Sequence, residues 1–250
     1  MSGDGAMHIQ QTPSPNFDAR SLPVSLLILH YTNMDSAEAA VARLCDQQSK
    51  VSAHYLISQT GEIIQMVDEA SRAWHAGVAF WGGIEDVNSA SIGIELDHQG
   101  HAADGTMAAY PEAQIASLID LSQDIIARHN IAAAGVLGHS DVAPGRKTDP
   151  GEALDWARLA GHGIGLWLDA VAVEPVEALR RDMQNPAVAA LQQALSAFGY
   201  KVAQDGVFGA GLEAVIISFQ RHFRPTRIDG VADAETQTLI YALCRAARRH

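Results

Sequence analysis

The chain has 250 residues, of which 48% are hydrophobic and 18% are charged. This balance can form a buried core and excludes the low-hydrophobicity composition of a disordered protein. Its 17 basic and 29 acidic residues give a formal net charge of -12. Because such a charge repels phosphate backbones and anionic membrane surfaces at long range, we expect no nucleic-acid partner.

No stretch of the chain is typical of a membrane span or a secretory signal. The most apolar runs are of strand length, well short of the ~20 residues that cross a bilayer. The first ten residues lack a cationic segment followed by an apolar run. We therefore expect no membrane span and a cytoplasmic location, with the periplasm as the alternative if a signal sequence has been removed.

Short β-rich runs alternate with longer amphipathic stretches over the first two thirds of the chain. This pattern predicts an α/β domain whose central mixed sheet is flanked by helices. The apolar run at 26–29 predicts a buried strand ending at His30, and residues 36–47 have the apolar spacing of a helix. Residues 54–57 and 63–67, separated by a Gln-Thr-Gly turn, predict a hairpin.

The next predicted elements are a strand, a helix and a second strand. Residues 91–96 predict a strand with alternating Ile and Leu residues on one face and Glu95 on the other. Residues 111–129 predict a helix, with a proline near its start and an apolar stripe along it. Residues 134–137 predict a last strand that leads into His139.

A composition change marks a predicted domain boundary, since the length exceeds that of one usual domain. An acidic segment containing valine and proline follows residue 168, and we interpret 169–182 as a linker. The predicted domains are therefore an α/β domain at 1–168 and a small helical domain at 183–250.

The small domain contains a weak internal repeat. Asp-Gly-Val-Phe-Gly at 205–209 and Asp-Gly-Val-Ala-Asp at 229–233 each precede a predicted helix. Together with a first helix at 188–198, they predict a three-helix domain of about 60 residues, a size at which helices can just bury one shared core.

Three side chains that can bind a metal fall at strand ends and in a loop: His30, His139 and Asp149. Catalytic zinc takes three protein ligands and leaves the fourth tetrahedral position for water, and two imidazoles with one carboxylate meet that requirement. The turn at Pro144-Gly145 makes convergence of the last two side chains feasible. We expect one Zn²⁺ per chain.

Most histidines in proteins are surface or hydrogen-bonded groups that bind no metal, and this chain has 11. His30 and His139 differ from the rest because each follows an apolar strand, where an imidazole in a cleft is hard to explain by packing. We interpret the histidines near helix ends, loops or termini as solvated: His8, His98, His101, His129, His162, His222 and His250.

Two further residues have side chains that suit amide hydrolysis. A carboxylate near a zinc-bound water can take its proton, which makes Glu95 the candidate base. Lys147 could place a positive charge beside the oxygen that becomes anionic when the amide carbon turns tetrahedral. Without a zinc site, Glu95 would be a solvent-facing strand residue and Lys147 a solvated loop lysine.

Four ordered motifs resemble a known family, the zinc N-acetylmuramoyl-L-alanine amidases of the AmpD and AmiD type, over about residues 20–168. The motifs are Leu-His-Tyr-Thr at 29–32, Arg-Ala-Trp-His-Ala-Gly at 72–77, Ser-Ile-Gly-Ile-Glu-Leu at 91–96, and Gly-His-Ser-Asp at 138–141 with Pro-Gly at 150–151. None is specific alone, but their ordered combination is.

The resemblance implies a role for each candidate residue. It implies that His30, His139 and Asp149 hold zinc, that Glu95 activates water, and that Lys147 stabilises the tetrahedral intermediate. It also implies a set of residues that hold the muropeptide: Arg72, Trp74, His75, Ala76, Asn88 and Arg146.

The end of the chain, residues 188–243, resembles a second family, the peptidoglycan-binding domain 1 family. The resemblance rests on Leu-Gln at 191–192, Phe-Gly-Tyr at 198–200, Asp-Gly at 205–206, Phe-Gly at 208–209 and Phe-Gln at 219–220. It implies that this domain binds glycan, although a helical domain that only packs on the catalytic one is the alternative.

The function predicted from the whole sequence is hydrolysis of the amide between N-acetylmuramic acid, including its anhydro form, and L-alanine. The partners would be muropeptides from cell-wall recycling or turnover, and the oligomeric state stays open. Two alternatives are a non-catalytic peptidoglycan-recognition protein and a zinc D,D-peptidase. The peptidase would need a further histidine near a glutamate late in the catalytic domain, and His162 has no such helical partner.

Overall fold

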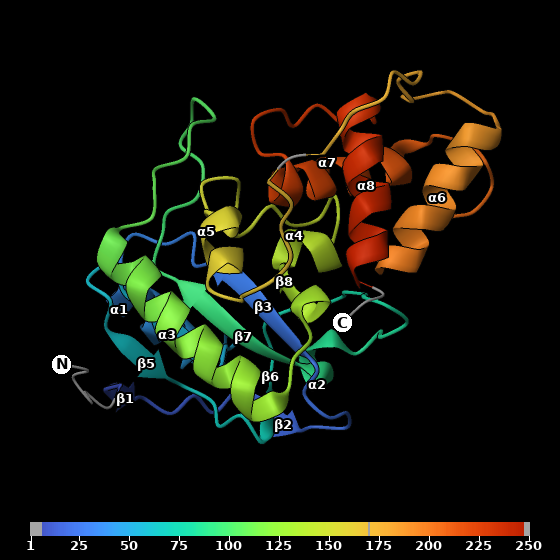
Figure 1. Ribbon diagram of the computed structural model, residues 1–250. Coiled ribbons are helices and arrows are strands. Elements are labelled where there is room, and N and C mark those ends of the chain that lie inside the picture. Colours follow the sequence, from blue (N-terminus) through green and yellow to red (C-terminus); the bar gives the residue numbers. More distant parts are fainter. Residues whose placement is uncertain (1–6, 170, 248–250) are drawn as a thin grey trace.

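The computed structural model describes residues 7–169 and 171–247. Within these residues the strands form a six-stranded mixed sheet in the order β1-β5-β4-β7-β3-β8 and a small sheet of β2 and β6 (Figure 1). The strands are β1 (Ile9–Gln11), β2 (Phe17–Ala19), β3 (Leu26–Tyr31), β4 (Tyr55–Ile57), β5 (Ile63–Gln65), β6 (Ser71–Ala73), β7 (Ser91–Leu96) and β8 (Val136–Gly138). The expected fold class, a mixed sheet with flanking helices followed by a helical region, is confirmed.

The central strands are buried because helices or loops cover both faces of the sheet. β3 runs parallel to β7 on one side and to β8 on the other, and its first five residues are buried. Parallel strands covered on both faces are usually continuous apolar runs, as the 26–29 segment is. The predicted hairpin is also confirmed, since β4 and β5 pair antiparallel.

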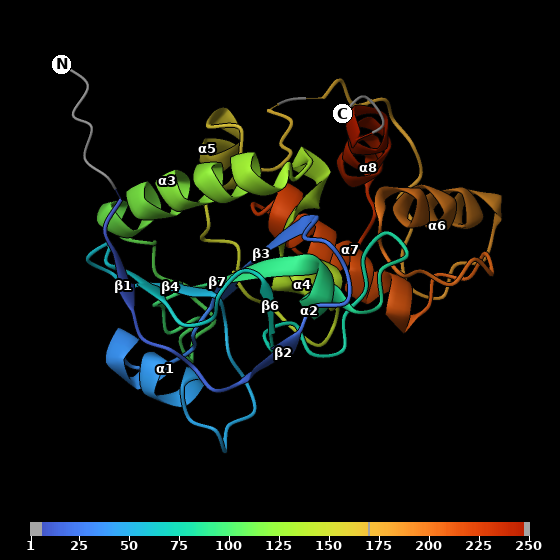
Figure 2. The ribbon, with the colours of Figure 1, turned by 90° about the horizontal axis from the view of Figure 1, so that it is seen from below.

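Two helices cover opposite faces of the sheet, α1 (Ala37–Leu44) and α3 (Glu112–His129) (Figure 2). α1 starts at Ser36, whose side chain accepts a hydrogen bond from the backbone N–H of Ala39 and so satisfies one of the free donors of the first turn. α3 ends at Asn130 in the left-handed conformation, the usual way to end a helix.

Short helices stand before and after the parallel strands β7 and β8. They are α2 (Val87–Ala90), η1 (Ala133–Gly135), α4 (His139–Val142) and α5 (Trp156–Gly161). α4 begins directly where β8 ends, so the predicted last strand does lead into His139. The strand itself starts later than predicted, because residues 133–135 form a 3-10 turn.

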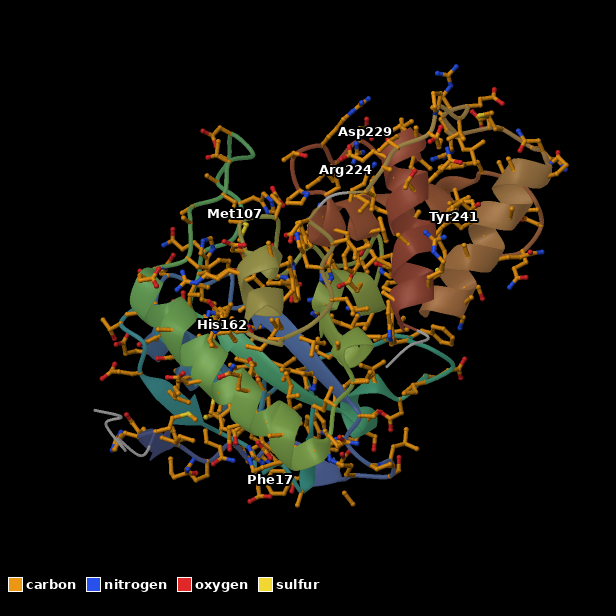
Figure 3. The ribbon with its side chains drawn as sticks, viewed as in Figure 1. Phe17, Met107, His162, Arg224, Asp229 and Tyr241 are labelled. Carbon is orange, nitrogen blue, oxygen red and sulfur yellow. The ribbon has the colours of Figure 1, made fainter. Side chains whose placement is uncertain are left out.

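The C-terminal helical region, residues 179–247, contains α6 (Pro186–Phe198), α7 (Ala210–Phe223) and α8 (Ala234–Ala247) (Figure 1). Arg224 and Asp229 lie together after α7, with guanidinium and carboxylate 3.8 Å apart (Figure 3). Residues 171–178 contain no helix or strand, and Leu179 then pairs with Ala232.

The internal repeat is visible as two equivalent glutamines that organise the two turns. Gln192 donates to Asp205 and accepts from the backbone N–H of Gly206. Gln220 donates to Asp229 in the same way and accepts from Gly230. Each buried amide therefore fixes the Asp-Gly turn that precedes the next helix.

One apolar core extends from the sheet into the C-terminal helical region. Ile28 and Leu137 of the sheet belong to the same buried cluster as residues of α6, α7 and α8. Trp81 completes this contact, with its ring 4.8 Å from that of Tyr200. It packs over Gly199, where a Cβ would lie 2.5 Å from the indole and where φ of 143° also favours glycine.

His98 contradicts one prediction, because it is buried rather than solvated. Its Nδ1 accepts from the backbone N–H of Gly100 and its Nε2 donates to the carbonyl of Ala108, so the ring holds both ends of the loop before α3. Met107 lies on this loop (Figure 3).

No helix in the described residues is both long and apolar enough to cross a bilayer.

Candidate active site

Three neighbouring parallel strands end at the candidate site. In the register of β3 and β7, His30 lies opposite Glu95. In the register of β3 and β8, Leu29 lies opposite Gly138, the residue before His139. Because paired residues of neighbouring strands point to the same face of a sheet, these side chains are brought into one row. The loop after α4 then brings Asp149 to the same place.

His30, His139 and Asp149 converge on one point and are all buried. The Nδ1 atoms of the two histidines are 3.0 Å apart, and Oδ2 of Asp149 lies 3.0 Å from the first and 2.9 Å from the second. Two ring nitrogens and a carboxylate oxygen this close repel one another through their lone pairs unless a proton or cation lies among them. Two imidazoles and one carboxylate form a donor set that suits zinc.

His139 is held in the tautomer that suits metal binding. Its Nε2 lies 2.9 Å from the carbonyl oxygen of Ala76, which can only accept, so Nε2 carries the proton and donates it. Nδ1 is then left with its lone pair directed at the other two ligands. A metal-binding histidine almost always donates its other ring N–H to an acceptor of this kind.

His30 is held in the same tautomer through a chain of three hydrogen bonds. The hydroxyl of Ser91 donates to the carbonyl of Val87 at 2.6 Å, so it accepts from Nε2 of His75, 3.1 Å away. Nδ1 of His75 is therefore an acceptor and takes the proton of His30 Nε2 at 3.0 Å. The lone pair on Nδ1 of His30 remains free for a cation.

The electrostatics of the site favour neutral imidazoles and an ionised carboxylate. Burial, together with the neighbouring His139, lowers the pKa of His30 to about 4. Burial also lowers the pKa of His75 well below its usual range, with His30 adding to the effect. Burial opposes ionisation of Asp149, but the closeness of the His139 and His30 rings outweighs this and holds the pKa of the carboxyl far below its ordinary value. These are the protonation states that metal ligands need.

Glu95 lies beside the three ligands and has an unusual environment. Burial and the nearby charge of Asp149 raise its pKa to about 8, against a smaller opposite effect of Lys147. Its Oε2 is buried and has no hydrogen-bond partner among the described residues. A buried carboxylate oxygen without a protein partner is a position where a water or substrate proton would be expected.

A hollow of about 570 Å³ opens over these residues, on the face of the sheet that α1 covers. Trp74, His75, Arg146 and Lys147 line it together with the three ligands and Glu95. Arg146 is anchored there, because its Nη2 donates to the carbonyl oxygens of Ala76 and Val78. The structure therefore brings together the expected catalytic residues and three of the expected substrate contacts.

The other three expected substrate contacts do not line this hollow in the described part of the chain. Arg72 is paired with Asp18 and Asp86. The side-chain oxygen of Asn88 accepts from the backbone N–H groups of His75 and Ala76, and so holds the segment that supports both histidine ligands. A role of Arg72, Ala76 and Asn88 in holding muropeptide stays a prediction.

The prediction that His222 is solvated is wrong. It is 2% exposed and packs face to face between Trp156 and Phe223. Its Nδ1 bonds to Oδ2 of Asp141 at 2.7 Å. The sequence pattern gave no sign of this, because the partner is 81 residues away. His250, also predicted to be solvated, lies outside the described residues.

Comparison with known proteins agrees with this geometry. Residues 20–152 match the family model described as N-acetylmuramoyl-L-alanine amidase, which is more than half of the chain. Residues 184–240 match the model of a peptidoglycan binding domain. The chain belongs to the N-acetylmuramoyl-L-alanine amidase family, and the expectation that it is an enzyme of this class is confirmed.

The relatives of the chain include amidases with and without the C-terminal helical region. The N-acetylmuramoyl-L-alanine amidase AmiD of Escherichia coli is 41% identical over 230 residues, which is 88% of this chain and 82% of AmiD. The 1,6-anhydro-N-acetylmuramyl-L-alanine amidase AmpD of Escherichia coli is 38% identical, over 60% of this chain and 88% of AmpD. The predicted resemblance to the AmpD and AmiD type is therefore confirmed.

A solved structure extends the likeness to the whole fold. AmiD from Escherichia coli, in complex with the substrate anhydro-N-acetylmuramic acid-L-Ala-D-gamma-Glu-L-Lys, superposes with a TM-score of 0.78 at 38% identity. The match covers 92% of each chain, so it includes the C-terminal helical region.

Proposed function

We propose that this chain is a zinc-dependent amidase that hydrolyses the amide between N-acetylmuramic acid, or its anhydro form, and the L-alanine of a muropeptide. The observation that carries the proposal is the convergence of two Nδ1 atoms and one carboxylate oxygen within 3.0 Å of one another, beside Glu95, whose Oε2 is buried. The substrate class rests on the AmiD complex with an anhydro-muropeptide.

The three ligands would hold one Zn²⁺, which when bound supplies the Lewis acid that polarises the amide carbonyl and lowers the pKa of water. Glu95 takes a proton from the attacking water and returns it to the leaving amine of L-alanine. The raised pKa of Glu95 in the metal-free protein makes its carboxylate a stronger proton acceptor than an ordinary glutamate. Lys147 lines the same hollow, where its positive charge would stabilise the oxyanion.

Other residues that line the hollow would orient the sugar and the stem peptide. Trp74 offers an aromatic face and Arg146 a fixed guanidinium on the wall of the hollow. The C-terminal helical region would bind glycan, as its family match suggests. A role in cell-wall recycling and a cytoplasmic location stay predictions, which fractionation of cells would test.

The test is digestion of anhydro-muropeptides and of intact peptidoglycan, followed by mass spectrometry. An amidase releases the whole stem peptide, whereas a D,D-peptidase would remove only D-alanine. Failure to release either product, with zinc bound, would favour a non-catalytic recognition protein. The matched variant Glu95→Gln should bind zinc like the wild type but lose turnover by about 100-fold or more; normal turnover would remove Glu95 from the mechanism.

A further inference from the structure

The turn that presents His139 is a single helical turn, α4 (His139–Val142). Such a turn cannot sustain itself, because forming the first turn of a helix fixes several residues for one hydrogen bond. Its position must come from tertiary contacts. It also controls the third ligand, since the backbone N–H of Ser140 donates to the carbonyl of Asp149 at 2.8 Å.

Asp141 is the centre of these contacts. Its side chain is 1% exposed, and Oδ2 accepts from the backbone N–H of Gly138 at the start of the turn. A buried carboxylate is costly unless its remaining lone pairs are satisfied. The backbone N–H of Gly138 is the donor from the N-terminal part of the chain. The two side chains that bond to Asp141 come from a different part of the chain.

Those partners belong to the C-terminal helical region. The hydroxyl of Tyr200 donates to Oδ1 of Asp141 at 2.8 Å, and Nδ1 of His222 bonds to Oδ2 at 2.7 Å. A third contact reaches the same turn, because the hydroxyl of Ser218 donates to the carbonyl of Ser140 at 2.6 Å. Tyr200, His222 and Ser218 are each at most 2% exposed, so water does not replace them.

Ser218 and His222 belong to α7, and this helix also reaches the segment after Asp149. Nε of Arg221 lies 3.4 Å from Oε2 of Glu152, whose Oε1 is 2.8 Å from His101. The C-terminal helical region is thus connected to both segments that carry ligands from the second half of the site.

We propose that the C-terminal helical region is a positioning element of the metal site, which holds the His139 turn through Tyr200, Ser218 and His222. This role is separate from glycan binding and rests on the metal site of the proposed function. None of these three residues lines the hollow over the metal site. They act through the backbone of α4, which sets where Nδ1 of His139 lies.

The test measures zinc binding by the full-length chain rather than activity. Tyr200→Phe removes one hydroxyl from the Asp141 network. His222→Leu and His222→Asn form a matched pair, because leucine and asparagine have nearly the same shape. Only asparagine has an N–H donor, Nδ2, bonded to Cγ as Nδ1 is in histidine. Ser218→Ala removes a single hydroxyl and serves if a larger change prevents folding. Gln192→Ala is the control, because its partners Asp205, Gly206 and Val207 all lie within the C-terminal helical region.

Zinc affinity is measured by competition with a chromophoric chelator, and ligand geometry by the visible spectrum of the Co²⁺ form. We expect Tyr200→Phe and His222→Leu to weaken zinc binding about tenfold, the lower end of the range for groups that support metal ligands, and to alter the Co²⁺ spectrum. His222→Asn should recover most of the affinity, and Gln192→Ala should lower stability without changing zinc affinity.

Wild-type zinc affinity and Co²⁺ spectra in folded Tyr200→Phe, Ser218→Ala and His222→Leu would overturn the proposal while leaving the amidase intact. Equal weakening by His222→Asn and His222→Leu, or by Gln192→Ala, would also overturn it, since the effect would then follow general destabilisation. If the wild-type chain itself bound no zinc, the metal site of the proposed function would be refuted, and the positioning role with it.

Discussion

His75 supports His30 without belonging to the ligand set, so its replacement separates ligand orientation from ligand identity. In His75→Phe the ring remains but both nitrogens are lost. Without the acceptor on His75, the metal-free variant can place the His30 proton on Nδ1, 3.0 Å from Oδ2 of Asp149. Zinc binding returns that proton to Nε2, which has an acceptor at 3.0 Å in the wild type but none in the variant, at a cost of about 1–3 kcal/mol. Since about 1.4 kcal/mol is a factor of ten in binding, we expect zinc affinity to fall by about 10- to 100-fold.

A second perturbation moves the His75 ring without changing its chemistry. Gly93 of β7 lies against this ring, and a Cβ there would be 2.5 Å from Cγ of His75. Gly93→Ala must therefore displace the imidazole, and we expect it to weaken zinc binding in the same direction as His75→Phe. Gly161→Ala is the matched control, because no atom lies within 4 Å of its added Cβ.

The assay is chelator competition on metal-free protein, with urea unfolding of each variant to confirm that it is folded. The expected order of zinc affinity is wild type and Gly161→Ala first, then Gly93→Ala and His75→Phe well below. If folded His75→Phe and Gly93→Ala both bound zinc as tightly as the wild type, the hydrogen-bond chain from Ser91 to His30 would have no part in metal binding.

Three further predictions concern stability. In metal-free protein the pKa of Glu95 is raised from 4.5 to about 8. Its contribution to the free energy of unfolding is therefore fully present below pH 4.5 and is lost as the pH rises through about 8. The stability of wild type relative to Glu95→Gln should fall by up to about 1.4 kcal/mol per pH unit between them; a constant difference in urea titrations would contradict this. Zinc at about 1,000 times its Kd should stabilise the metal-free protein by about 4 kcal/mol, and an unchanged melting temperature would argue against a preformed site. Gln220→Ala removes the acceptor for the N–H groups of Asp229 and Gly230, so it should cost about 2 kcal/mol or more, and a smaller loss would mean that water replaces the amide.

Much of the fold could be predicted because its signals are local. The apolar run of β3, the alternation of β7 and the stripe of α3 follow from the periods of strand and helix, and each element formed near its predicted bounds. The start of the last strand was predicted too early, because a 3-10 turn at 133–135 is not distinguished by apolar pattern from a strand.

The three candidate metal ligands and Glu95 were also recognisable, since they stand at strand ends, in a loop and on the polar face of a strand. Their meeting was not derivable from spacing alone. His30 lies opposite Glu95 only because β3 pairs with β7, a choice of neighbour that depends on the whole sheet. The motifs that resemble the amidase family were what connected the four residues beforehand.

By itself the sequence determined the strand and helix pattern, the chemistry of the ligand set and the family. Tertiary structure decided which polar groups support that set. His75 bonds to His30, and Asn88 accepts from the backbone N–H of His75. His222 bonds to Asp141, 81 residues away in the chain. A buried hydrogen bond depends on which surfaces meet after the chain has folded, and no local period in the sequence records that meeting.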